Sequence, residues 1–400
     1  MIRRNSRLLR LLAVLAALSV AGAACGGKKD DTQPGALEST TTSTIPKGPD
    51  TVAARLHKNL DALLQEHVAL AAATTGAAIG GRSEELTAAG SALDANAVAL
   101  TAEITAVLGP DPGKEFDGVW KQHVATFKGG AAQAGSDLNT FPSAFGAFIN
   151  SALPDLSASS AAELLRQHLS ELKNVVDAQA AGDQTKAYTS LRTAMEHMDA
   201  IAEPLTAAMA AKFPEKVSGN PKSPAAQLLT TLNSGLQEHV FLATAATNAA
   251  LGGRQEEYVA AAAALNDNSN ALSAAIGSVY GAKAGTAFGP LWKQHIAFLV
   301  DYTTAAAAKD SIKQDKAMAD LLGYAQAFGA FLSQASPALT ADSVSELIKT
   351  HIFTLKDAID AQAASNQAKA YERIRTAAAH MSMIATTLTA AIVKQFPENF

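Results

Sequence analysis

Residues 63–82 read LLQEHVALAAATTGAAIGGR, and residues 235–254 read GLQEHVFLATAATNAALGGR, an offset of 172 positions. From residue 146 onward a second match has an offset of 183, between GAFINSALPDLSASSAAELLRQHL and GAFLSQASPALTADSVSELIKTHI. Self-similarity over this length indicates a tandem duplication of a whole domain. The two offsets differ because the first copy lacks 11 residues between about 127 and 145.

The duplication divides the chain into segments. Residues 51–216 are predicted to form the first helical domain and residues 224–400 the second, with residues 217–223 as the linker. Residues 26–50 read GGKKDDTQPGALESTTTSTIPKGPD, a composition typical of a flexible tether. The remaining residues, 1–25, have the character of an export signal.

The export signal ends at the single cysteine of the chain. MIRRNSRLLR is basic, LLAVLAALSVAGAA is apolar but short for a membrane span, and Cys25 follows at once. A cysteine after a small-residue cleavage site resembles a bacterial lipoprotein lipobox, so we expect lipidation of Cys25. The tether would then hold the folded body at the extracytoplasmic face of a bacterial cell membrane. The alternative is simple secretion, with cleavage near Ala23.

The pattern of apolar residues predicts helices in both copies. Apolar-periodic runs end in polar or Gly turns, and each is followed by a second such run. This spacing predicts three αα-hairpins per copy, hence six helices per copy and about twelve in all. The many alanines favour close helix packing, and no stretch has the strict alternation of a strand. We therefore expect an all-α protein built from helical bundles.

Eight of the nine histidines recur at equivalent positions of the two copies. His57 is the exception, because Leu229 stands at its equivalent position. The four pairs are His67 with His239, His123 with His295, His168 with His351, and His197 with His380.

Hairpin geometry predicts that these histidines share a layer. His351 and His380 lie on either side of a turn near Ser365, each about 21 Å from it at 1.5 Å per residue. His239 and His295 precede His351 by the same period of 56 residues, so aligned hairpins would bring all four to one level. The 3-4 spacing of the flanking apolar residues directs the imidazoles into the bundle or close to it.

A layer of imidazoles inside a helical bundle is a candidate metal site, one per copy. Met198 and Met381 directly follow His197 and His380, and a thioether beside imidazoles favours copper, with zinc or iron second. The candidate ligands are His67, His123, His168, His197, His239, His295, His351, His380, Met198 and Met381.

Two alternatives remain open for the histidine layer. Its members can be structural core histidines, bonded to one another, to Glu66 and Glu238, or to nearby amides and hydroxyls. Such a chain would be a non-catalytic structural or interaction protein of the cell envelope. Haem bound by two histidines is the other alternative, although the chain has no C-x-x-C-H attachment motif.

The sequence does not suggest an enzyme or a nucleic-acid-binding protein. It contains no HExxH, GxSxG or Walker motif, and no constellation of nucleophile, base and orienting group. A net charge of -5 gives no basic footprint for nucleic acid. The membrane, reached through the lipid anchor, is the predicted partner; a protein partner is not indicated.

The stretch LNDNSNALSAAIGSVYGAKAGTAFGPLWKQHIAFLVDYTTAAAAKD, residues 265–310, resembles a family of exported bacterial helical proteins often labelled copper amine oxidase-like. The resemblance extends through HIFTLKDAIDAQAASNQAKAY and AAAHM over most of the second copy. It implies an exported helical protein and favours copper. It does not extend to oxidase chemistry, because a copper amine oxidase forms its quinone from a Tyr that follows Asn, and no Asn-Tyr dipeptide occurs here.

Overall fold

The computed structural model describes residues 48–129 and 131–400, without the side chains of residues 131–139. The predicted signal peptide, Cys25 and nearly all of the tether lie outside the described residues. The described residues contain twelve α-helices, one short 3-10 helix and no strand, which confirms the all-α prediction. The first copy contains α2 (Val52–Ile79), α3 (Ser83–Leu108), α4 (Pro110–Lys128), α5 (Ala131–Ala152), α6 (Ala158–Ala180) and α7 (Gln184–Lys212). The second contains α8 (Pro224–Leu251), α9 (Gln255–Tyr280), α10 (Ala282–Ala307), α11 (Ser311–Ala335), α12 (Ala341–Ala363), α13 (Gln367–Gln395) and the 3-10 helix η1 (Pro397–Asn399).

Polar caps and single glycines set the ends of these helices. Ser223 caps α8 by accepting a hydrogen bond from the amide of Ala226, and Ser157 caps α6 through Ser160. Gly109 alone separates α3 from α4, and Gly281 alone separates α9 from α10, with φ of 94° and 91°. These φ values lie in the region that favours glycine, so a one-residue connection between long helices depends on it.

The 11 residues missing from the first copy shorten one hairpin, as the alignment predicts. Helix α4 has 19 residues and α5 has 22, whereas their equivalents α10 and α11 have 26 and 25. The equivalent helices start or end together at the base of the hairpin, so the loss falls at its tip.

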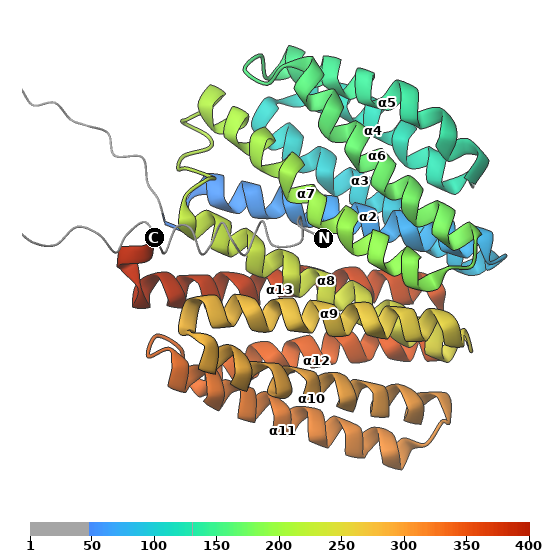
Figure 1. Cartoon of the computed structure of the whole chain (residues 1–400), viewed down its shortest axis with the longest axis vertical. Coiled ribbons are helices and arrows are strands. Elements are labelled where there is room, and N and C mark those ends of the chain that lie inside the picture. Colours follow the sequence, from blue (N-terminus) through green and yellow to red (C-terminus); the bar gives the residue numbers. More distant parts are fainter. Residues whose placement is uncertain (1–47, 130) are drawn as a thin grey trace, which may run out of the picture.

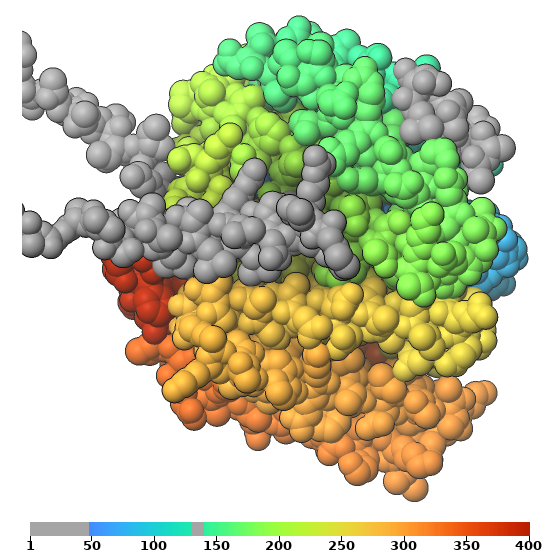
Figure 2. Space-filling view, viewed as in Figure 1, coloured from blue at the N-terminus to red at the C-terminus, as the bar shows by residue number. Residues whose placement is uncertain are grey.

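The two copies pack together along their first helices. Helix α2 packs against α8, while α3 packs against α13 and α7 against α9. Since α3 is equivalent to α9 and α13 to α7, this pairing has the symmetry of a pseudo-two-fold relation between the copies. Figure 1 shows the first copy, blue to green, lying above the second, yellow to red. To the right of centre in Figure 2, the green surface of the first copy meets the yellow surface of the second.

A pair of equivalent ion pairs joins the copies. Arg375 donates from Nε to Glu66 at 2.8 Å, and Arg192 donates from Nε to Glu238 at the same distance. Both glutamates are buried, and each also accepts a hydrogen bond from an asparagine of its own copy, Asn96 or Asn268. Charge-assisted bonds of this kind fix the register of two packed surfaces.

Two of the described helices, α3 and α13, are long and apolar enough to cross a membrane by length and composition alone. Both lie within the bundle, and α13 carries the buried His380 and Met381. Apolar character of this kind is also typical of the core helices of a helical bundle.

Candidate metal centre

Three imidazoles of the first copy converge in its core. His67, His123 and His168 come from α2, α4 and α6, the first helix of each hairpin. The Nε2 atoms of His67 and His123 are 3.1 Å apart, and one nitrogen from each of the three rings lies within 4.8 Å of the others. We call this group triad one.

The second copy repeats the arrangement with His239, His295 and His351, from α8, α10 and α12. Nε2 of His239 lies 3.3 Å from Nε2 of His295, and again one nitrogen per ring lies within 4.8 Å of the other two. We call this group triad two. The hairpin period of 56 residues therefore does place these side chains together in space.

The separations suit a single metal ion. Imidazole nitrogens bind zinc or copper at about 2.0–2.1 Å, so three ligands at tetrahedral or trigonal angles are about 3.3–3.6 Å apart. The two measured pairs, at 3.1 and 3.3 Å, are already close to this spacing. The third nitrogen of each group lies within 4.8 Å of the other two, so a small movement of that ring would complete either site.

All six imidazoles are buried in the core. Their exposed fractions are between 0% and 2%. Burial lowers the pKa of His67 well below its ordinary value, and the neighbouring imidazoles of His123 and His168 lower it further. Burial likewise lowers the pKa of His295, to about 4. A neutral imidazole presents a lone pair, the form that binds a metal.

Apart from the Nε2–Nε2 contact within each triad, most triad nitrogens have no hydrogen-bond partner among the described residues. Both nitrogens of His168 and of His351 are buried and unpartnered, as is Nδ1 of His67, His239 and His295. A neutral imidazole carries one donor and one acceptor, and leaving either unmet in the core costs about 1–3 kcal/mol. Glu66 and Glu238, which the structural alternative offered as partners, bond instead to Arg375 and Arg192 across the copy interface.

His197 and His380 belong to the same level but not to the triads. Nε2 of His197 lies 3.2 Å from the carbonyl oxygen of Leu164, and Nε2 of His380 lies 2.9 Å from that of Leu347. Each imidazole thus bonds to the backbone of the preceding helix of its own hairpin. Of the four histidines predicted to form a layer in each copy, three form the triad. The fourth, His197 or His380, bonds one helix of the hairpin to the other.

Met198 and Met381 lie beside the triads. Met198 and His168 line one small cavity of about 10 Å³, and Met381 and His351 line an equivalent one of about 20 Å³. Both methionines are fully buried. Cavities of this size leave no room for a haem macrocycle, so the described core favours a bare ion over the haem alternative.

Aromatic rings enclose both triads, and one of them differs between the copies. Phe141 stacks on His123 with ring centroids 4.2 Å apart and an interplanar angle of 9°. Its counterpart is Tyr324, which stacks on His295 with centroids 5.0 Å apart. The buried hydroxyl of Tyr324 has no hydrogen-bond partner in the part of the chain that the structure describes. The two centres therefore share their histidines but not their aromatic surroundings.

Sequence reasoning missed the role of His57. It lies at the copy interface, where its Nε2 is 2.8 Å from Oδ1 of Asp199 and its Nδ1 is 3.3 Å from the carbonyl oxygen of Pro221. The only sign in the sequence that His57 differs from the other histidines is that Leu229 stands at its equivalent position in the second copy. The arginines after the Gly-Gly turns, Arg82 and Arg254, are each half-buried in an ion pair with a glutamate of the next helix turn.

Comparison with protein-family models, with curated proteins and with solved structures finds no match to this chain. The class of protein is therefore defined by its geometry: a duplicated helical bundle with one buried group of three histidines in each copy.

Proposed function

We propose that this protein binds two metal ions, one in each histidine triad, and that copper in its monovalent state is the preferred ion. The observation that carries the proposal is the convergence of three buried imidazoles in each copy, of which His168 and His351 have no hydrogen-bond partner for either nitrogen among the described residues. A metal ion would accept one lone pair from each of the three rings at once. Hydrogen bonding within each triad joins only two of its three rings, His67 with His123 and His239 with His295.

The charge of the site favours copper(I) over divalent ions. The metal-ligating groups found among the described residues consist of histidines alone, without a carboxylate or a thiolate. A divalent ion would bring two uncompensated charges into an apolar core, whereas copper(I) brings one. Imidazole and thioether ligands also suit copper(I), and Met198 and Met381 line the cavities beside the triads.

Burial favours storage or transfer of the ion over catalysis. The triads are at most 2% exposed, and the adjoining cavities are about 10 and 20 Å³, too small to admit an organic substrate to the ion. We therefore propose a binding or buffering role without enzymatic turnover. From the export signal and Cys25, we further propose that the protein acts as a lipoprotein at the extracytoplasmic face of a bacterial membrane.

Metal stoichiometry in matched variants tests the proposal. The purified protein is loaded with copper(I) under anaerobic conditions, in competition with a chromophoric chelator, and its metal content is measured. We expect about two ions per chain for the wild type, about one for His168→Leu or for His351→Leu, and none for the double variant.

The matched control is His380→Leu. This residue lies at the level of triad two but bonds to a backbone carbonyl, so this variant should still bind two ions. Absence of stoichiometric metal in the wild type, or equal metal content in the wild type and the double variant, would sink the proposal and leave the structural role of the histidines in its place. If the protein binds zinc more tightly than copper(I), the choice of metal is refuted, but the proposal of a metal site is not.

A further inference from the structure

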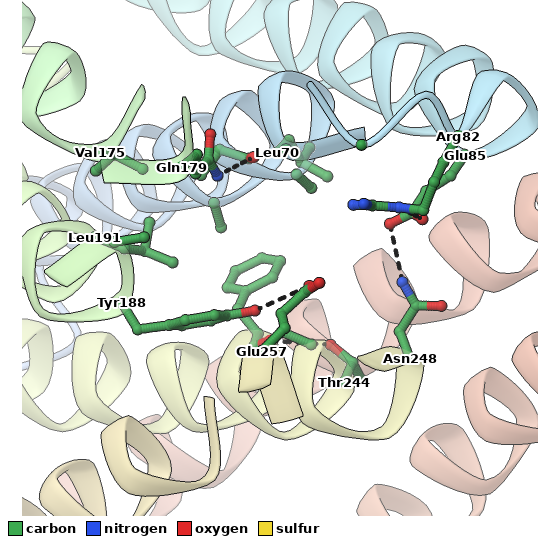
Figure 3. A pocket seen from close by; sticks show the side chains of 18 of the residues that line it. Leu70, Arg82, Glu85, Val175, Gln179, Tyr188, Leu191, Thr244, Asn248 and Glu257 are labelled. Atoms are coloured by element: carbon green, nitrogen blue, oxygen red, sulfur yellow. Dashed lines mark hydrogen bonds and ion pairs between the residues drawn. The ribbon is translucent and has the colours of Figure 1, made fainter. Parts of the chain in front are cut away.

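A cavity of about 160 Å³ lies between the two copies, at the hairpin tips and away from the metal triads. Figure 3 shows it bounded by α2, α7 and α8, with Arg82 at one end. Its apolar wall includes Leu70, Val175, Leu191 and Phe241. Its polar groups include Arg82, Glu85, Gln179, Tyr188, Asn248 and Glu257.

The cavity exists because the two copies differ along one helix. Its lining is largely duplicated, with Ala73 equivalent to Ala245 and Tyr188 equivalent to Tyr371. Three positions are smaller on α2 than on α8, namely Ala69, Ala72 and Gly76 against Phe241, Thr244 and Asn248. Helix α2 thus leaves open the space that the larger side chains of α8 fill.

The carboxylates at the cavity already have partners. Glu85 accepts hydrogen bonds from Nε of Arg82 at 2.6 Å, from Asn248 at 2.9 Å and from the hydroxyl of Tyr371 at 3.3 Å. Glu257 accepts from Nε of Arg254 at 2.7 Å. Neither carboxylate is left to attract a cation.

The arginines, by contrast, have donors to spare. Arg82 bonds to Glu85 through Nε alone, and its two Nη groups make no hydrogen bond to the described residues. Figure 3 shows its guanidinium extending from the helix end toward the interior of the cavity. Nη2 of Arg254 is buried and likewise unpartnered. Arg254 lies outside the cavity lining, so the free guanidinium donors of the cavity are those of Arg82. Because the carboxylates are already bonded, such a cavity selects an acceptor, and a guanidinium fork matches a carboxylate.

We propose that this cavity binds a small organic carboxylate with a compact apolar body, with its carboxylate at Arg82 and its body against Leu70, Val175, Leu191 and Phe241. A protein cavity of about 150 Å³ holds a benzene-sized molecule, which sets the size of the ligand. The hydroxyl of Tyr188, which makes only a long hydrogen bond of 3.5 Å to Glu257, lies beside the same space (Figure 3) and can orient the polar end.

Benzoate is the probe, and benzyl alcohol is the uncharged control of the same size. Binding to the purified wild-type protein is followed by saturation-transfer NMR and calorimetry. We expect saturable binding of benzoate, at least about tenfold tighter than that of benzyl alcohol, because only the carboxylate uses the guanidinium. Equal affinities for the two molecules, or no saturable binding of benzoate up to about 10 mM, would overturn the proposal.

Two variants locate the site. Arg82→Met should weaken benzoate at least about tenfold, whereas the equivalent change Arg254→Met, outside the cavity lining, should change it less than about threefold. Ala69→Phe, which installs the residue found at position 241, should fill the space and abolish binding; Ala72→Thr is the milder form if Ala69→Phe does not fold. Wild-type affinity in Arg82→Met and in the cavity-filling variant would refute the location. The copper content of all these variants should stay at the wild-type value. Measuring it shows whether the carboxylate proposal has failed by itself or the metal proposal has failed as well.

Discussion

Acid should unfold the metal-free protein, because most triad imidazoles resist protonation in the folded state. Burial lowers the pKa of five of them, with His295 near 4: His67, His168, His239, His295 and His351. In the unfolded chain a histidine titrates near 6.5. The unfolded state therefore binds more protons than the folded state once the pH falls below about 6.5, and the free energy of unfolding decreases.

The size of the effect follows from proton linkage. A histidine that stays neutral in the folded state lowers the free energy of unfolding by about 0.8 kcal/mol at pH 6.0 and about 1.4 kcal/mol at pH 5.5. Five such residues together lower it by about 4 and about 7 kcal/mol. Since native proteins are stable by only about 5–15 kcal/mol, we expect the acid-unfolding midpoint between about pH 5 and pH 6.

Urea unfolding of chelator-treated protein, followed by circular dichroism at several pH values from about 7.5 to 5.5, measures this loss. His351→Leu is the internal control. This variant removes one proton-binding site of the unfolded state. Its free energy of unfolding should therefore decrease between these pH values by about 1.4 kcal/mol less than that of the wild type. A free energy of unfolding that stays constant within about 1 kcal/mol over this range would refute the reasoning, because it would mean that the triads accept protons while folded.

Three further changes test particular contacts. Glu66→Ala should lower the free energy of unfolding by about 2 kcal/mol in urea titrations, because it strands the guanidinium of Arg375 at the copy interface; no loss would remove the anchoring role of this ion pair. Tyr324→Phe should raise the free energy of unfolding of the metal-free protein by about 1 kcal/mol, because it deletes a buried unpartnered hydroxyl and installs the residue of the first copy, Phe141; destabilisation would show that the hydroxyl has a partner. Burial lowers the pKa of His57, but the hydrogen bond and charge of Asp199 outweigh this and raise it, so His57 stabilises the fold fully below about pH 6.5 and less as the pH rises. The urea midpoint of His57→Leu should accordingly fall further below that of the wild type at about pH 6 than at about pH 8, and an equal deficit at both would contradict the assignment.

The sequence predicted the heights of the histidines along their helices but not their directions around them. Counting residues from each turn placed His351 and His380 at one level, and the structure keeps them there. One helix turn holds 3.6 residues, so a difference of one position rotates a side chain by about 100°. Met381 occupies the inward direction beside His351, and its neighbour His380 is turned toward the carbonyl of Leu347 instead.

Contacts between the copies could not be predicted from the periodicity. Each copy has a complete pattern of apolar faces, and the pattern does not say which face meets the other copy. Glu66 and Glu238 stand next to the triad histidines in sequence, which suggested a bond to those rings. Arginines from the other copy, Arg375 and Arg192, bind them instead, and only the docked arrangement reveals this.

The pseudo-two-fold packing of α2 on α8 is the arrangement of an isologous dimer, here joined into one chain by residues 217–223. In a homodimer every substitution at the shared surface is made twice, once in each subunit. A fused chain is free of that constraint. It can have Ala69 where the second copy has Phe241, which opens a cavity on one side. It can likewise have His57 where the second copy has Leu229, which gives one side a titratable group. Both halves still keep the same three histidines. The covalent link thus lets a symmetric scaffold carry one pair of equivalent centres and a set of unique features.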